Sequence, residues 1–338
     1  MKELLKNLCL LNGISGDEGR VREFIISQIK DHAQLTVDPL GNLIAFCKGK
    51  PSKNRVLVSA HMDEVGLIVT YINSDGTLKF DCVGGVDPKV VFAKRVRVGD
   101  QSVLGVIAHK AVHNISKDER IKTVPFENLV IDIGCESREQ AEKLVRQGDS
   151  VHFVSEFLEF GDGFVKCKAI DDRAGCAMMI KLIQDRPEYD TYFTFVVQEE
   201  IGLRGATTAS YSVDPDFAFV LESTTASDIP GAENDKKVCE LGKGPVVSYM
   251  DRHTIYDKEM YDLAFDTAKS NNIPCQTKSV IAGGNDAGAI HISRGGVRTT
   301  AVSLPCRYLH SPSCVIKQSD MDNAYKLIKL LLDRTYNK

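Results

Sequence analysis

The spacing of apolar side chains predicts helices and buried strands toward both ends of the chain. Ser15 and Glu18 have the spacing of a capping box, and one apolar face at helical spacing follows, made of Val21, Phe24, Ile25 and Ile29. The apolar run over 55–60 is typical of a strand buried on both faces. Similar runs predict strands over 191–197, 216–221, 275–280 and 297–304. Helices are predicted after Asp171, over 255–269, over 286–293 and from a Ser319 cap onward.

Between these two parts the pattern changes to short strands separated by glycine and aspartate turns. Strands are predicted over 66–71, 95–98, 103–108, 129–133 and 151–154. One helix interrupts them, with a capping box at Ser137 and Gln140 and an end at Gly148. We therefore predict a β-rich domain over 66–159, with a barrel as its simplest form. It is inserted into a discontinuous α/β domain over 1–65 and 160–338, because exposed loops tolerate insertions.

The composition is that of an ordinary globular protein, and the length is sufficient for two domains. The chain has 338 residues, of which 43% are hydrophobic and 26% charged, with a net charge of -4. No basic stripe is present, so nucleic acid is not an expected partner. The beginning of the chain has no signal-peptide pattern and no apolar run is long enough to span a membrane, so we expect a cytoplasmic protein. The ten cysteines form no CxxC pair, which excludes a zinc ribbon, and without a signal-peptide pattern we expect them to be reduced thiols.

Metal-binding residue types follow several of the predicted strands. His61, Glu199–Glu200 and Glu222 come directly after apolar runs, His310 comes six residues after another, and Asp171 begins a helix. Each has a simpler interpretation alone, as an exposed acidic residue, a loop histidine or a helix cap. Since ligands gather at the carboxyl ends of strands in α/β sheets, the coincidence of five segments favours a shared site.

The chemistry of peptide hydrolysis fits that set of side chains. Two divalent metal ions about 3.5–4 Å apart supply an activated bridging water as nucleophile and stabilise the oxyanion. Five residues would hold them: His61, Asp171, Glu200, Glu222 and His310. Glu199 then stays available as the general base that takes the water's proton. Asp63 can accept the second imidazole N–H of His61 and orient its ring.

Five segments of the chain resemble the M42 aminopeptidases, which are the tetrahedral, glutamyl or deblocking aminopeptidases. They are Ala60–Gly66, Lys168–Arg173, Gln198–Ala206, Gly283–Ala289 and Arg307–Pro312. The resemblance runs over nearly the whole chain. It implies that Asp171 bridges the two metals, that His61 and Glu222 complete one site, and that Glu200 and His310 complete the other. Glu222 stands where many relatives carry Asp, and Asn285 replaces an expected Thr.

The resemblance also implies a fold, an assembly and a choice of metal. The expected fold is an α/β catalytic domain of the zinc-peptidase type, with a mixed sheet and an inserted PDZ-like β-barrel domain used in oligomerisation. Relatives form dimers that build dodecamers, so a homo-oligomer is expected. Two divalent ions per subunit are expected, zinc or cobalt first and manganese as a further option. The Asp171–Asp172 peptide bond is expected to be cis.

Two other functions compete with the peptidase. A glycosidase would use two of the carboxylates, but it gives the histidines no role, and the chain lacks tryptophan for stacking on sugars. A scaffold that has lost its metals would lack a ligand or the base, and here all are present. The preferred N-terminal residue of the peptide substrate is left open. Arg252 and His253 are candidates for an acidic preference, although an exposed loop is the simpler interpretation.

Overall fold

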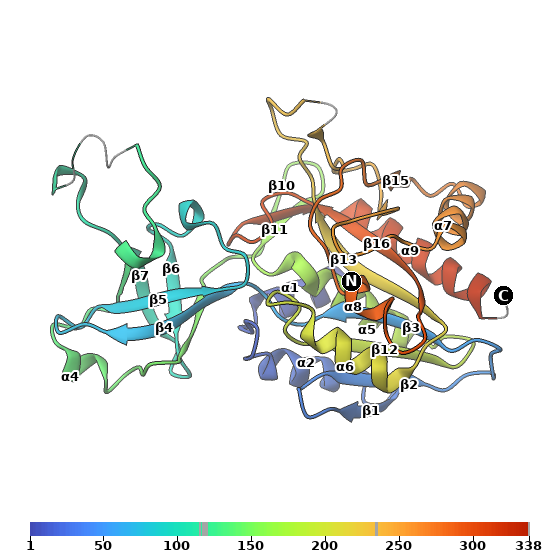
Figure 1. Ribbon diagram of the computed structural model, residues 1–338, viewed down its shortest axis with the longest axis horizontal. Helices are drawn as coiled ribbons and strands as arrows, with labels where there is room; N and C mark the ends of the chain where they lie inside the picture. Colours follow the sequence, from blue (N-terminus) through green and yellow to red (C-terminus); the bar gives the residue numbers. More distant parts are fainter. Residues whose placement is uncertain (115, 117–120, 234–235, 337–338) are drawn as a thin grey trace.

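The computed structural model describes residues 1–114, 116, 121–233 and 236–336. Its largest element is a mixed eight-stranded sheet in which three parallel pairings, β12 with β3, β3 with β13 and β13 with β16, form the centre (Figure 1). In spatial order the strands are β1 (Gln34–Val37), β2 (Leu43–Cys47), β12 (Thr191–Val196), β3 (Val56–His61), β13 (Phe217–Thr225), β16 (Arg298–Cys306), β14 (Val246–Val247) and β15 (Gln276–Thr277). The central strands are buried on both faces, which explains their continuous apolar runs.

Helices cover both faces of this sheet. Alternate residues of β3 and β13 enter two different clusters: Val56, Val58, Phe217 and Phe219 face one side, and Leu57, Ala218 and Val220 face the other. The first side packs on α1 (Lys2–Leu10), α2 (Gly19–Ile29), α5 (Ile170–Gln184), α7 (Lys258–Ser270) and α9 (Gln318–Thr335). The second side packs on α6 (Arg204–Val213) and α8 (Ala287–Ile290).

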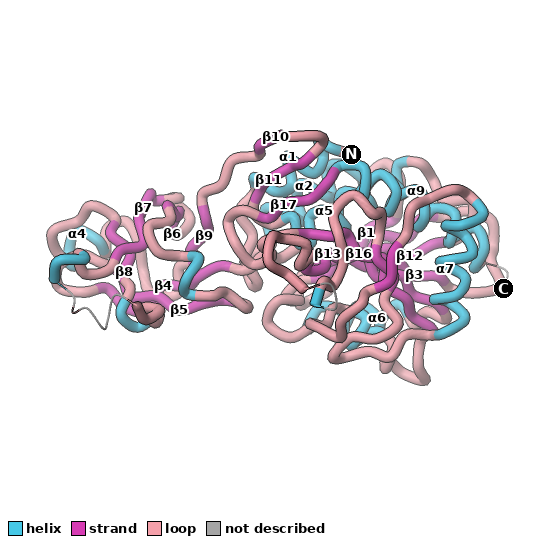
Figure 2. Tube along the Cα trace, turned by 90° about the horizontal axis from the view of Figure 1, so that it is seen from above, coloured by secondary structure: helices cyan, strands magenta, loops and turns pink. Residues whose placement is uncertain are grey.

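The middle of the chain forms a closed six-stranded barrel with its own apolar core. Its strands are β4 (Gly66–Ile72), β5 (Leu78–Val83), β6 (Arg95–Val98), β7 (Val103–Ala108), β8 (Val130–Asp132) and β9 (Ser150–Phe153). Short helical segments join them: η1 (Pro88–Val90), η2 (Val112–Asn114), η3 (Phe126–Asn128) and α4 (Arg138–Ala141). Figures 1 and 2 show the barrel beside the α/β part rather than on top of it. The predicted β-rich middle is thus a barrel, although α4 ends well before Gly148.

A three-stranded sheet returns the chain to the α/β part. It consists of β10 (Leu158–Phe160), β11 (Phe164–Cys167) and β17 (Cys314–Lys317). Its strand β11 leads directly into α5, and β17 closes the loop that carries His310. The sheet therefore brings two of the predicted site segments to the same region.

Several predicted helix boundaries are wrong. Ser15 caps no helix, because its hydroxyl donates to Asp63 instead, and α2 starts after Glu18 without a side-chain cap. The last helix begins at Gln318, before the predicted Ser319 cap. Helix α7 begins after Asp257, whose carboxylate accepts the Met260 N–H, rather than at residue 255. At the first of these helices the predicted capping side chain hydrogen-bonds elsewhere in the fold, and at α7 a different residue supplies the cap.

Some elements were predicted at the wrong length or not at all. The expected strand over 275–280 is only the two-residue β15, and the expected helix over 286–293 is the short α8. Helix α1 and the hairpin β1–β2 are additional. Among the described residues, no helix combines the length and apolar character needed to cross a bilayer.

Candidate metal centre and active site

The parallel register of the central strands brings the predicted residues to one end of the sheet. Val196 at the end of β12 pairs with His61 at the end of β3. Val220 of β13 pairs with Ser59, so Glu222, two residues later, is level with His61. The prediction that β13 stops before Glu222 is wrong, since the strand continues to Thr225. Register therefore explains why residues 161 positions apart become neighbours.

Asp171 lies between two groups of possible ligands. Its Oδ1 lies 3.4 Å from His61 Nε2, and its Oδ2 lies 3.7 Å from His310 Nε2. Glu222 Oε1 completes the first group at 3.5 Å from His61 Nε2. Glu200 Oε2 completes the second at 3.3 Å from His310 Nε2. Each group of one imidazole and two carboxylates is compact enough for one metal ion, and the two share Asp171.

The first turn of α5 presents Asp171 in an unusual backbone conformation. Asp171 and Asp172 have non-helical dihedral angles although they lie within the helix bounds, and Ala169 before them has a φ of 55°. The peptide bond between Asp171 and Asp172 is cis, as predicted. Asp171 is 7% exposed, so its carboxylate stands at the cavity while the rest of the turn is buried.

Both imidazole rings are oriented by backbone carbonyl groups. His61 Nδ1 lies 3.0 Å from the Asp63 carbonyl oxygen, and His310 Nδ1 lies 2.9 Å from that of Gly85. A hydrogen on each Nδ1 leaves the Nε2 lone pairs facing the carboxylates. Gly85 follows β5, so the barrel segment helps to position a residue of the α/β part. Nothing in the sequence indicated this contact, because a backbone carbonyl has no residue signature.

Asp63 holds the turn that carries Glu199 and Glu200. Its Oδ1 accepts the Glu199 N–H at 3.0 Å, and its Oδ2 accepts the Glu200 N–H at 3.1 Å. The Ser15 hydroxyl donates to Oδ2 at 2.6 Å, and the Gln198 N–H is bound by Glu18 at 3.1 Å. Asp63 was predicted to orient His61, and its Oδ1 does lie 3.4 Å from His61 Nδ1. Its hydrogen bonds show that it also fixes the backbone of the predicted base.

Burial and crowding shift the pKa values of this centre. Burial would lower the pKa of the His61 imidazole, but Glu222, Asp171 and Asp63 outweigh it and raise the pKa well above its usual value. Burial raises the pKa of Glu222 to about 8, with a further contribution from the charge of Asp171. Burial also raises the pKa of Glu199 well above its usual value. Carboxylates held this close need positive charge between them, which protons or metal cations supply.

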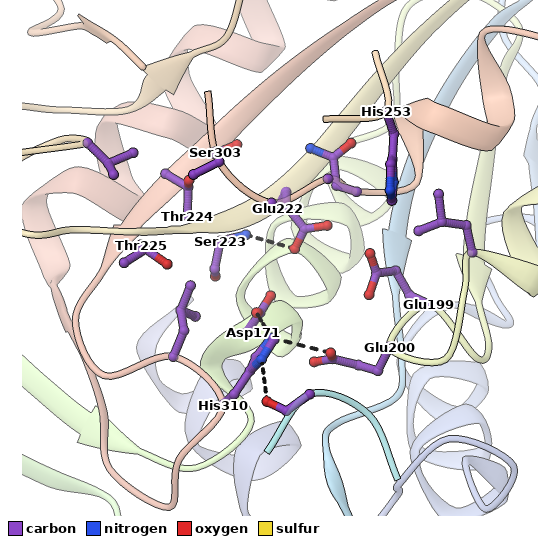
Figure 3. Close-up of a pocket in the computed structure, with 18 of the residues that line it drawn as sticks. Asp171, Glu199, Glu200, Glu222, Ser223, Thr224, Thr225, His253, Ser303 and His310 are labelled. Carbon is purple, nitrogen blue, oxygen red and sulfur yellow. Dashed lines mark hydrogen bonds and ion pairs between the residues drawn. The ribbon is translucent and has the colours of Figure 1, made fainter. Parts of the chain in front are cut away.

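Four of the candidate ligands line a cavity of about 510 Å³, namely Asp171, Glu200, Glu222 and His310. Figure 3 shows Glu199 and Glu200 on one side of it, His310 and Asp171 at its base, and Thr224, Thr225 and Ser303 on another side. His253 and Asn285 also line the cavity, whereas Arg252 is exposed and does not. Asp171, Glu199 and Glu222 therefore all face the same cavity.

Comparison with known proteins places this arrangement in a family. Residues 41–327 match the family model described as M42 glutamyl aminopeptidase. The chain belongs to the M42 aminopeptidase family. The prediction of an aminopeptidase, and hence of a hydrolase acting on peptide bonds, is confirmed.

Other members of the M42 family match over nearly their full lengths. The lysyl aminopeptidase of Pyrococcus furiosus is 36% identical over 344 residues, covering 98% of this chain and 96% of the relative. The structure of a TET aminopeptidase from the marine sediment archaeon Thaumarchaeota archaeon has a TM-score of 0.95 at 35% identity, covering 99% and 96% of the two chains. The Pyrococcus horikoshii TET1 peptidase can assemble into a tetrahedron or a large octahedral shell, and its structure has a TM-score of 0.87 at 35% identity, covering 98% of each chain.

Proposed function

We propose that this M42 member uses two divalent metal ions to hydrolyse N-terminal residues from peptides. Zinc or cobalt are the expected ions, and manganese is a further option. The observation that carries the proposal is the pair of three-residue groups that share Asp171. Each group offers an imidazole and two carboxylates, a donor set that accepts all three metals. The histidine in each group supports hydrolysis at a metal centre over glycosidase chemistry, which uses two carboxylates and gives an imidazole no role.

The residues fit such ions in ways beyond their type. Asp171 Oδ1 and Glu222 Oε2 are buried and, within the part of the chain that the structure describes, accept no hydrogen bond. Buried polar atoms without partners are costly, and a cation between them would remove that cost. The Nε2 atoms of His61 and His310 face the same space. When bound there, the two ions would lower the pKa of a water molecule and polarise the peptide carbonyl.

Glu199 is the residue proposed to move the proton. Its backbone is fixed by Asp63, and its side chain lines the cavity beside the two groups. Burial raises its pKa, which favours a carboxylate that can accept a proton from water and return it to the leaving amine. Glu199 also forms a third possible ligand group together with His61 and Glu200. Its role as a base therefore has to be separated from a role as a metal ligand.

The variant Glu199→Gln separates these roles. It removes the proton acceptor while keeping the size of the side chain, so we expect turnover of an aminoacyl-anilide to fall by at least about 100-fold. Metal content, measured by mass spectrometry of the purified protein, should stay at two ions per subunit. If metal content falls together with activity, Glu199 is a ligand and the proposed base is wrong. If the protein hydrolyses a glycan and this activity continues in the presence of a chelator, the result would instead support a glycosidase.

We also propose that residues 66–159 form a separate inserted PDZ-like domain, which contributes to a homo-oligomer such as a dodecamer built from dimers. The barrel has its own core, and β7 turns Leu104 and Val106 outward, with 57% and 44% of their surfaces exposed. Apolar side chains exposed side by side are typical of interfaces. Light scattering on the full chain tests this, with Leu104→Glu expected to shift the mass toward smaller species. A monomeric wild type would contradict it.

A further inference from the structure

Two turns that carry candidate metal ligands also carry buried charged residues that the proposed chemistry does not use. Glu64 lies in the turn that follows His61 at the end of β3. Lys168 directly follows β11, and Arg173 lies two residues after Asp171 in the first turn of α5. Glu64, Lys168 and Arg173 are 3%, 3% and 0% exposed. All three stand outside the lining of the 510 Å³ cavity and outside the candidate ligand set.

One carboxylate oxygen joins these three side chains, which we call the Glu64 cluster. Lys168 Nζ donates to Glu64 Oε1 at 2.5 Å, and Arg173 Nη2 lies 3.7 Å from the same oxygen. Glu64 belongs to the turn of His61, whereas both cations belong to the segment around Asp171. The cluster therefore connects the two turns directly, and the loss of its single negative charge would leave two buried cations without that partner.

The end of α1 supplies further acceptors to the two cations. The Leu8 carbonyl, in the last turn of α1, accepts from Arg173 Nη1 at 2.8 Å. The Leu11 carbonyl, just beyond the helix, accepts from Lys168 Nζ at 2.7 Å. Cations are favourable at this end of a helix because its carbonyl groups carry partial negative charge. The first helix thus anchors the segment that presents Asp171.

The Gly13 carbonyl contacts both turns at once. It accepts the Glu64 N–H at 3.0 Å and Arg173 Nη2 at 3.1 Å. A Cβ at position 13 would lie 2.9 Å from Arg173 Nη2 and 2.7 Å from Val21 Cγ2, so a larger residue would force this contact apart. A glycine is therefore needed where the chain meets the cluster.

Net stability is a poor explanation for the Glu64 cluster. The cost of removing charges from water offsets most of their attraction, and apolar residues of similar volume often give equal or greater stability. Buried charges with directional hydrogen bonds do restrict geometry, because a displaced donor or acceptor loses its partner. Here they restrict how the His61 turn lies against the Asp171 turn, and His61 Nε2 and Asp171 Oδ1 are 3.4 Å apart.

We propose that the Glu64 cluster positions the turn of Asp171 against the turn of His61, and thereby sets the affinity of the centre for metal ions. The inference rests on the metal-dependent function proposed for the same site. The three residues touch neither the cavity nor the ligand positions, so they act through the placement of the ligands. Residues that support metal ligands from outside change metal affinity or activity about 10- to 100-fold when they are replaced.

The experiment measures cobalt binding by Glu64→Gln in the full chain. Glutamine keeps the shape of the side chain and removes the charge that faces both cations. We expect the affinity for one of the two cobalt ions, measured by competition with a chelator, to fall at least about 10-fold. The visible absorption of bound cobalt reports ligand geometry, and it should shift. With an aminoacyl-anilide, kcat should fall while KM changes little, because the cluster does not line the cavity.

A second variant tests the same bond from its other side. Lys168→Met removes the ammonium group and keeps the length of the side chain, so it should also weaken cobalt binding and shift the absorption. The double variant Glu64→Gln/Lys168→Met should lose less affinity than the two single losses combined, since both changes break one bond. Lys168→Met also provides the test if Glu64→Gln does not fold.

Two control variants separate positioning from a general loss of charge or stability. Glu188→Gln breaks the exposed Lys50–Glu188 ion pair, which has a distance of 2.7 Å and lies before the start of β12, away from the strand ends with the ligands. Ile25→Val removes one methyl group from the buried core cluster that includes residues of α5. Neither control should change cobalt affinity or absorption, although Ile25→Val should lower the unfolding temperature.

The outcomes distinguish this inference from the function on which it rests. A lower unfolding temperature in Glu64→Gln, with unchanged cobalt affinity and absorption, would overturn the positioning role. An equal loss of affinity in Ile25→Val would overturn it too. A wild type that binds no cobalt would defeat the metal centre and this inference together. A wild type that binds two cobalt ions but hydrolyses no aminoacyl-anilide would defeat the aminopeptidase proposal alone.

Discussion

Replacing Asp63 with asparagine tests whether this buried carboxylate positions the turn that carries the proposed base Glu199. The side chain is fully buried and accepts hydrogen bonds from the Glu199 N–H, the Glu200 N–H and the Ser15 hydroxyl. Asparagine has the same shape but turns one acceptor oxygen into a donor. The Ser15 hydroxyl can rotate to accept from it, whereas a backbone N–H cannot, so one N–H loses its acceptor and the other bond loses its charge.

The size of the effect follows from the bonds that are lost. A hydrogen bond to a charged group contributes about 1.5–3 kcal/mol, and leaving a buried donor unpaired costs a similar amount. If the lost bond shifts Glu199 away from the position it needs in the transition state, kcat falls about 10- to 100-fold. We expect KM to change little, because Asp63 does not line the cavity.

The assay is turnover of an aminoacyl-anilide, measured together with metal content and thermal unfolding. Asp63→Asn should lower kcat and the unfolding temperature while both ions are kept. Ser15→Ala is the graded control, since it removes one of the three bonds and leaves both backbone N–H groups paired. It should therefore lower kcat less than Asp63→Asn does. Full kcat in Asp63→Asn, or an equal loss in Ser15→Ala, would refute the reasoning.

Two further predictions concern the shared carboxylate and its neighbour. Asp171→Asn should lose metal from both positions, because each oxygen of Asp171 faces a different histidine; two ions retained at full occupancy would contradict a bridge. In the metal-free protein the pKa of Glu222 is raised from 4.5 to about 8, so between these values the folded chain holds a proton that the unfolded chain has released. Stability of the metal-free wild type should therefore fall as pH rises across that window, and Glu222→Gln should reduce the fall. If the unfolding temperatures of the wild type and of Glu222→Gln change equally with pH between pH 5 and pH 8, Glu222 does not cause the loss of stability.

The buried parallel strands were the part of the fold that the sequence predicted best. The runs over 55–60, 191–197, 216–221 and 297–304 correspond to β3, β12, β13 and β16, because strands buried on both faces need apolar residues throughout. The same strands end near the candidate ligands, which is why the sequence could predict that these side chains lie close together. The two-residue strands β14 and β15 have too few residues to show a pattern, and they were missed or placed too long.

Residues that act through tertiary contacts had no local signal. Ser15 precedes an apolar face at capping-box spacing, and only the fold shows that its hydroxyl binds Asp63. Gly85 contributes a carbonyl oxygen, which every residue possesses. Arg252 and His253 were considered for substrate preference, and of the two only His253 lines the cavity.

The most direct test of the metal centre is an anomalous diffraction map of zinc-loaded crystals. Two peaks about 3.5–4 Å apart are predicted, with Asp171 between them. His61 and Glu222 should contact one peak, and Glu200 and His310 the other, with Glu199 touching neither. A single peak, or two peaks that share no contact with Asp171, would contradict the dinuclear centre.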